Sequence, residues 1–174
     1  MGKKSSLSAA RIAFSAVIAA GALLGILSVF LLWTRYPDWY SIPGYTGWEV
    51  FTGDVVSYLI GWMPGVVLFF SIIALAGAVA SVITARAKRG DIAILAGVVI
   101  FVAVIIFTVD VGISTQTYYV MDVVTYELIP TEADPSIGTG VIFAAIAGIL
   151  IAVFGGLAAV FKEKESRSPE ERTE

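Results

Sequence analysis

The side chains in this chain that could do chemistry are carboxylates, serines and tyrosines, because it contains no cysteine and no histidine. That absence removes disulfides, thiolate nucleophiles, zinc sites of the Cys/His type and every catalytic triad that needs His. Eight carboxylates lie in or beside two polar stretches between apolar runs: Asp38, Glu49, Asp54, Asp110, Asp122, Glu127, Glu132 and Asp134. Their spacing does not match an EF-hand loop. We therefore expect solvated acidic loops, no metal, no cofactor and no enzymatic activity.

Polar side chains inside the apolar runs are equally few. The four serines at mid-run positions are Ser15, Ser28, Ser71 and Ser81. A proton- or ion-coupled carrier normally places an ionisable residue at mid-membrane, facing the bundle, and these runs have no Asp, Glu, Lys or Arg between their ends. This pattern favours a non-enzymatic protein acting through assembly, as an accessory subunit or by self-association. The alternative is a small transporter or channel for an uncharged solute or lipid.

The helices that position these groups can be predicted from an excess of apolar residues. The chain has 174 residues, of which 58 % are apolar and 14 % charged, whereas soluble domains have roughly 45–50 % and 25 %. Four charge-free runs cover residues 12–34, 55–85, 92–109 and 135–161. Crossing the hydrocarbon takes ~20 apolar residues. We predict an all-α membrane protein, a single four-helix transmembrane domain with spans at about 10–33, 56–85, 91–112 and 138–161.

The distribution of basic residues orients these spans. Ten of the eleven Lys and Arg residues lie before the first span, between the second and third, or after the fourth, and Arg35 is the exception. The positive-inside rule then places both termini in the cytoplasm of a cell membrane. The first run is too long for a signal-peptide core, so we expect it to be retained as an anchor. The tail, residues 162–174, should extend the last helix and fray near Pro169. The net charge of −3 gives no reason to expect nucleic acid as a partner.

Small residues spaced by four predict close helix packing, because in lipid the contact energy depends on near approach of backbones. The residues expected at such packing interfaces are Gly21, Gly25, Gly140, Ala144, Gly148, Ala152 and Gly156. The last five are expected to share one narrow stripe of the fourth span. Packing within one bundle and an interface with a second copy or another membrane subunit both remain open. Pro64, about two turns into the second span if it begins near Val55, should kink that helix.

The two outer loops, residues 35–54 and 113–137, predict a small β-containing extracellular cap. Residues 114–127 are rich in β-branched and aromatic residues, which favours a strand or hairpin, with a short amphipathic helix as the alternative. Residues 45–51 could pair with them. Asp54 is expected to favour the N-terminus of the second span, and Asp110 to be half buried under the cap. The cap's aromatic residues, whose role is structural or as a contact surface, are Trp39, Tyr45, Trp48, Tyr118, Tyr119 and Tyr126.

The four spans, the cytoplasmic termini and a first outer loop with Trp39 and Gly47-Trp48 resemble the claudin-type four-span plan. The claudin pattern has Gly-Leu-Trp with two cysteines, whereas this chain has no intervening Leu and no cysteine, so a junction-forming function does not carry over. The chain also resembles small four-span proteins of bacteria and archaea with a Gly-Trp outer loop. That resemblance implies a topology and no activity; the partners it leaves are the lipid bilayer and other copies or subunits.

Overall fold

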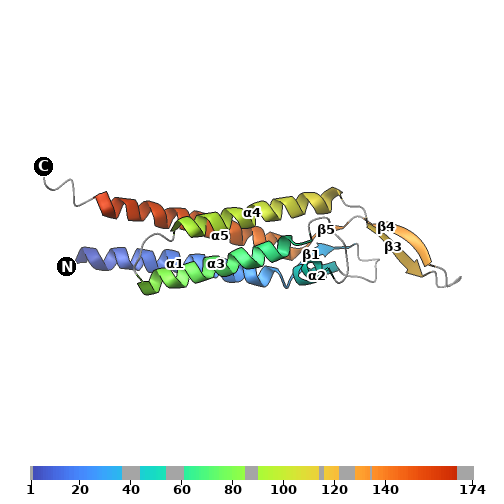
Figure 1. Ribbon diagram of the computed structural model, residues 1–174, viewed down its shortest axis with the longest axis horizontal. Helices are drawn as coiled ribbons and strands as arrows, with labels where there is room; N and C mark the ends of the chain where they lie inside the picture. Colours follow the sequence, from blue (N-terminus) through green and yellow to red (C-terminus); the bar gives the residue numbers. More distant parts are fainter. Residues whose placement is uncertain are drawn as a thin grey trace.

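The protein is mostly α-helical, with its strands gathered at one end of a helical bundle (Figure 1). The computed structural model describes residues 2–36, 44–53, 61–84, 90–113, 116–121, 128–133 and 135–167. The helices are α1 (Gly2–Ser28), α2 (Gly47–Thr52), α3 (Met63–Thr84), α4 (Gly90–Ile113) and α5 (Thr139–Arg167). The strands are β1 (Leu32–Arg35), β2 (Gly44–Thr46), β3 (Gln116–Met121), β4 (Leu128–Ala133) and β5 (Ser136–Ile137).

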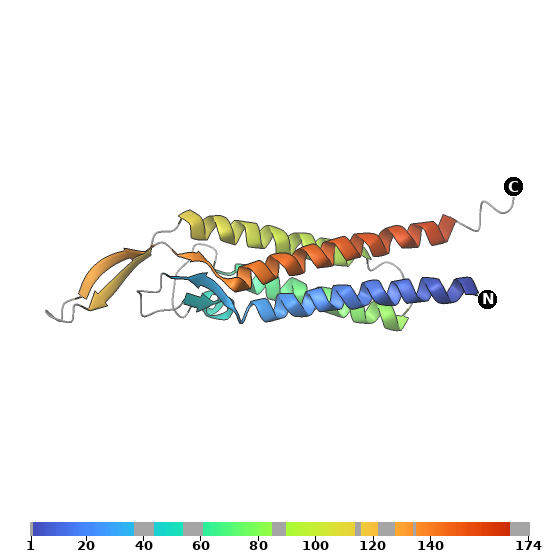
Figure 2. The ribbon, with the colours of Figure 1, turned by 180° about the vertical axis from the view of Figure 1, so that it is seen from behind.

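The four long helices form a bundle in which each packs against its neighbours in the chain. Helix α1 packs against α3 and α5, and α4 packs against the same two helices. The start of α1 and the end of α5 lie at one end, and the strands lie at the other (Figures 1 and 2). We call the end with the strands the cap end.

Three of these helices are long and apolar enough to cross a membrane, over Met63–Ile83, Asp91–Ile113 and Thr139–Phe161. Their 21 to 23 residues correspond to about 32–35 Å at 1.5 Å per residue, enough for a hydrocarbon layer of ~30 Å. The apolar part of α1, Ile12–Ser28, is shorter. These helices indicate a membrane-embedded protein.

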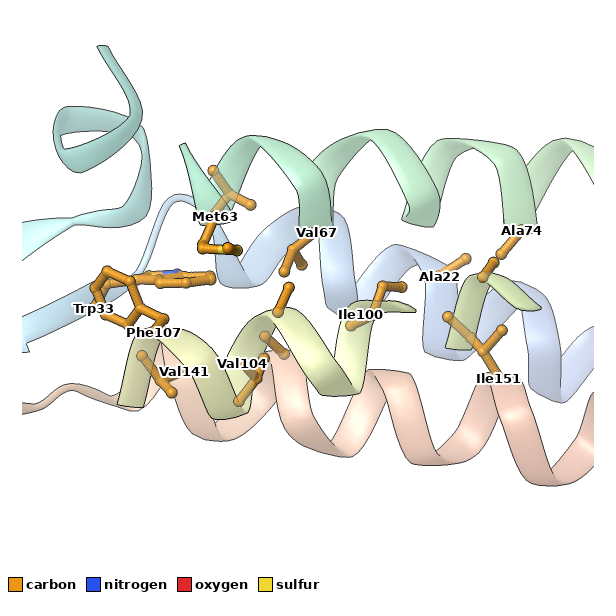
Figure 3. Close-up of a cluster of buried hydrophobic side chains, with 14 of the residues drawn as sticks. Ala22, Trp33, Met63, Val67, Ala74, Ile100, Val104, Phe107, Val141 and Ile151 are labelled. Atoms are coloured by element: carbon orange, nitrogen blue, oxygen red, sulfur yellow. The ribbon is translucent and has the colours of Figure 1, made fainter. Parts of the chain in front are cut away.

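The packing of the bundle places small residues inside and large apolar residues outside. Ala22, Ala74 and Ala144 are at most 1 % exposed, whereas Ile83 and Ile113 at the helix ends are about three-quarters exposed. Larger buried side chains, among them Val67, Ile100 and Ile151, fill the space between the alanines (Figure 3). Such a surface requires an apolar solvent, because a soluble helix turns its large apolar residues toward the core.

Helix α1 ends at Ser28, before the predicted end of the first span near residue 33. The amides of Val29, Phe30 and Leu31 donate to carbonyls three residues earlier, over 3.0 to 3.3 Å. Such bonds tighten the last turn and close the helix. The chain then turns into β1, so the expected final turn of the span is a strand of the cap.

Strand β1 is the centre of a three-stranded antiparallel sheet with the order β2-β1-β5. Its register with β2 shifts between Leu32 and Thr34, as at a β-bulge, which leaves Trp33 as the additional residue. Gly44 has φ +133° and lies against the carbonyl of Thr34; only glycine adopts such a conformation readily. Because β5 pairs with β1, strands from both predicted loops belong to one sheet.

Strands β3 and β4 form a separate antiparallel hairpin that projects beyond the bundle (Figures 1 and 2). Its register runs from Gln116 opposite Ala133 to Met121 opposite Leu128. Residues 116–121 are therefore a strand, as expected for the second loop, and the helical alternative does not hold for them.

The first outer loop differs from the expectation that residues 45–51 pair with the second loop. Tyr45 belongs to β2, and Gly47–Thr52 is helix α2. The reason is a capping box: Thr46 Oγ1 accepts from the amide of Glu49, and the Glu49 carboxylate accepts from the Thr46 amide at 2.8 Å. These bonds satisfy two amides at the start of a helix and favour it over a strand. Asp54, expected to favour the second span, lies outside the described residues.

Helix α3 begins at Met63, several residues later than the predicted start of the second span. Pro64 therefore lies in the first turn of the helix. An amide N–H at this position would have no acceptor within the helix, so the lack of one in proline costs nothing, and the proline ring does not clash with a preceding turn. The amide of Val66 donates to Trp62 O at 3.2 Å, which closes this first turn. The kink predicted at Pro64 has no physical basis in this position. Helix α5, by contrast, continues into the tail as expected, as far as Arg167.

Candidate functional site: the cap and its junction with the bundle

Trp33 joins the cap to the bundle. Its indole is fully buried, Nε1–H donates to Ser28 O at 2.8 Å, and the ring packs edge-to-face on Phe107 of α4 at 4.9 Å (Figure 3). A Cβ atom at Gly47 would lie 2.6 Å from Trp33 Nε1, and one at Gly140 would lie 2.5 Å from Trp33 Cδ1. Two glycines thus make room for the indole, which contacts α2, α4 and α5 together.

Helix α2 is attached to the end of α1 through the backbone amides of its first turn, which have no acceptor within α2 itself. Gly47 N–H donates to Leu31 O at 3.1 Å, and Trp48 N–H donates to Val29 O at 2.8 Å. The first amides of one helix therefore satisfy carbonyls that follow the last turn of another, which are otherwise without helical partners. This attachment was not predicted from the sequence, although the Thr46-x-x-Glu49 spacing is typical of a helix start at this position.

The aromatic residues expected to form the cap separate into buried and exposed members. Tyr45 is 7 % exposed and packs edge-to-face on Tyr36, with centroids 5.9 Å apart, whereas Trp48 is 44 % exposed. Burial, and secondarily the charge of Glu49, raises the pKa of the Tyr45 phenol above its ordinary value of 10.0. Trp39 and Tyr126 lie outside the described residues, and Tyr118 and Tyr119 are placed in β3 by their backbone.

Asp110 lies in the last turns of α4 and is 5 % exposed, more deeply buried than the sequence suggested. Phe107, one turn earlier, packs on Trp33. Helix α4 also packs against β5 near this end. Among the described residues there is no group of three or more His, Cys, Asp or Glu side chains that could hold a metal ion.

Most of the small residues predicted at packing interfaces lie against another helix of the same chain. A Cβ atom at Gly21 would lie 3.2 Å from Ile151, one at Gly148 would lie 3.0 Å from Gly97 O, and Ala144 is fully buried. Gly156, in contrast, faces open space. A step of four residues advances about 400° around a helix, so each step drifts by about 40° and four steps by about 160°. Gly140 and Gly156 therefore lie on different faces of α5, and the expected single stripe is spread around the helix.

Ala152 continues the contact between α4 and α5, because a Cβ atom at Gly97 would lie 2.9 Å from Ala152 Cα. Gly97 has the same spacing of four from Ala93 in the third span, whereas Gly155, which also meets the opposite helix in this interface, was not among the predicted packing residues. Gly155 lies one helical turn after Ala152 in the sequence, and its role in packing depends on the phase of the facing helix.

The four mid-span serines are all found between α1 and α3 or at the end of α1. Ser81 Oγ donates to Ala78 O at 2.7 Å, so Ser15 is the donor in the 2.6 Å bond between Ser15 and Ser81. Ser28 Oγ donates to Gly25 O at 2.6 Å. Ser71 Oγ is fully buried against Gly25, and within the described residues no hydrogen-bond partner reaches it. A Cβ atom at Gly25 would overlap this hydroxyl, so the seam is closely packed here.

The chain was compared with protein-family models, with curated proteins and with solved structures. No family model matches it, and neither of the other two searches found a match. The resemblance to the claudin-type plan therefore stays a prediction, and a functional argument depends on the geometry described above.

Proposed function

We propose that this chain is a non-enzymatic, four-span protein of the cell membrane that acts through assembly, either with other copies of itself or as an accessory subunit of a membrane complex. In this proposal α1 also crosses the membrane and brings the number of spans to four, because it packs against both α3 and α5. Both termini are then cytoplasmic, because ten of the eleven Lys and Arg residues flank the spans on the side of the termini in the sequence, and only Arg35 lies on the side of the cap. The start of α1 and the end of α5 lie opposite the cap (Figure 1). The cap then faces outward.

The observation that carries the proposal is the β3–β4 hairpin. A hairpin of two strands is marginally stable alone in water and normally gains a third strand or a packing partner. Here the two strands pair only with each other, and each leaves one backbone edge unpaired among the described strands. An exposed edge is a template for a strand of another chain.

The two edges of the hairpin are not equivalent. Strand β4 contains Pro130, which has no amide to donate, whereas the six residues of β3, Gln116–Met121, include neither proline nor a charged residue. Proline protects an edge from pairing, and an uncharged strand avoids like-charge repulsion between copies. The β3 edge is therefore the better acceptor for a partner strand.

The bundle interior gives less support to the alternative, a path for an uncharged solute. The serine seam between α1 and α3 is the polar feature that such a path would use. At Gly25 this seam has no room for a methyl group beside Ser71. Passage would require the two helices to separate.

The proposal is tested by co-expressing two differently tagged copies, extracting them in mild detergent, purifying through one tag and measuring the intact mass. Assembly predicts either the second tag or another membrane subunit in fixed ratio. A second variant replaces residues 116–133 by a short Gly-Ser linker. It should lose the association and keep the helical content and unfolding midpoint of the parent. A single copy carrying only lipid would contradict the proposal.

A further inference from the structure

Helix α2 turns its large aromatic residues outward and its small residues inward. Gly47 and Val50 are buried, whereas Trp48 is 44 % and Phe51 43 % exposed. Phe30, just beyond the end of α1, is 54 % exposed and stacks on Trp48 with ring centroids 6.0 Å apart. We call Phe30, Trp48 and Phe51 the aromatic cluster. Its arrangement is the reverse of a helix on a water-soluble surface.

The aromatic cluster crosses the bundle surface from α1 to α3. Trp48 contacts Phe51, with centroids 6.0 Å apart. The Phe51 ring lies over Gly65 in the first turns of α3, where a Cβ atom would be 2.9 Å from Phe51 Cζ or closer to other ring atoms. On the α1 side the cluster continues a column of exposed apolar residues, Leu23, Leu27 and Phe30, each at least half exposed. The cluster is therefore continuous with the surface that faces lipid.

The polar groups of α2 are directed away from this exposed surface or satisfied within the helix. Thr52 Oγ1 donates to Trp48 O at 3.1 Å. The Glu49 carboxylate accepts from Thr46 N and Thr46 Oγ1, at 2.8 and 2.9 Å. The only charge of α2 is thus held at its own N-terminus, where the helix dipole favours it. The exposed side is left with two aromatic rings and a hydroxyl that bonds to its own helix.

From these contacts we propose that the aromatic cluster docks on the lipid surface itself, at the boundary between headgroups and acyl chains, and so fixes the depth of the cap end. Trp is enriched at this boundary because its ring is apolar and its indole N–H is polar, and Trp48 lies between the two phenylalanines of the cluster. The continuity with the lipid-facing column of α1 and the lack of a free charge on the exposed side fit lipid better than a protein partner. This inference does not depend on assembly, so either proposal can fail without the other.

The test uses the intrinsic fluorescence of Trp48 in vesicles that contain brominated lipids. A variant with Trp39→Phe and Trp62→Phe keeps Trp33 and Trp48, and a second variant adds Trp48→Phe. Trp33 is fully buried and serves as the internal reference. The difference between the two variants reports Trp48 alone, and the fold is checked by helical circular dichroism.

We expect lipid brominated near the headgroup end of the acyl chain to remove most of the Trp48 emission, and lipid brominated near the terminal methyl to remove less. Trp33 emission should change little with either lipid. Loss of Trp48 emission to aqueous iodide instead would place the cluster in water. Protection from both quenchers would show that a protein chain covers it. Each of these two results overturns the inference.

Discussion

The glycines of the long helices divide into two groups that should respond oppositely to replacement by alanine. A Cβ atom at Gly97 in α4 would lie 2.6 Å from Gly148 O and closer still to Ala152 N, both in α5. Ordinary van der Waals contact begins at 3.4 Å, so the two backbones would have to separate by at least about 0.8 Å to relieve the contact with Gly148 O, and by more for Ala152 N. A Cβ atom at Gly77 in α3 would meet nothing within 4 Å.

The expected magnitudes follow from these distances. Overpacking of a closely fitted interface costs about 1–3 kcal/mol, and the obstacle at Gly97 is backbone, which cannot rotate away as a flexible side chain would. Replacing glycine by alanine inside a helix stabilises the helix by about 0.8–1.0 kcal/mol when nothing obstructs the new methyl group. Gly77→Ala should therefore raise the free energy of unfolding by up to about 1 kcal/mol, whereas Gly97→Ala should lower it by up to about 2 kcal/mol after the same gain is subtracted.

The assay is reversible unfolding of the purified protein in bicelles, followed by helical circular dichroism. Gly156→Ala is a second control, because Gly156 also faces open space although the spacing of four had suggested a packing role. Repeating the measurement at several protein concentrations separates stability from association. If Gly97→Ala and Gly77→Ala shift stability in the same direction and by similar amounts, the close approach of α4 and α5 is refuted.

Three further predictions concern the cap. Trp33→Phe should lower the free energy of unfolding by about 2 kcal/mol or more, through the lost hydrogen bond and the space left in the core, while Trp48→Phe stays within about 0.5 kcal/mol; equal effects would contradict the role of Trp33. Thr46→Ala should cost about 1 kcal/mol and speed hydrogen exchange of the α2 amides, and unchanged exchange would argue against the capping box. Because the pKa of Tyr45 is raised above 10.0, mainly by burial and then by Glu49, its neutral form is favoured in the folded state. The contribution of the Tyr45 phenol to the free energy of unfolding should therefore be fully present below pH 10.0 and be lost as the pH rises from there through the folded-state pKa. This alkaline loss of stability should be smaller in Tyr45→Phe.

The helical part of the fold is predictable from the sequence because it depends on composition. Long charge-free runs require helices in an apolar solvent, since backbone groups there must be satisfied within the segment. The ends are less predictable. Residues Val29 to Trp33 are as apolar as the span that precedes them, and the helix nevertheless closes at Ser28, where Trp33 turns back to donate to Ser28 O. That closure depends on space provided by Gly47 and Gly140, both of which lie outside this span.

The candidate site was predictable only at the level of single residues. The Thr46-x-x-Glu49 spacing contains enough information to place a helix in the first outer loop. No local pattern separates Tyr45, which is buried, from Trp48, which is exposed. The difference comes from the register of β2 against β1 and from the attachment of α2 to the end of α1. Burial of Asp110 likewise depends on what the folded cap places around the end of α4.

The central claim is a bundle of four spans whose cap lies outside, and cysteine accessibility tests it most directly, because the chain has no cysteine of its own. Ser5→Cys near the start of α1, Lys88→Cys between α3 and α4, and Thr131→Cys in β4 would each be treated with a membrane-impermeant maleimide in intact cells. The account predicts labelling of Thr131→Cys alone, and of the other two only after the membrane is permeabilised. Labelling of Ser5→Cys in intact cells would show that α1 does not cross the membrane and would contradict the four-span account.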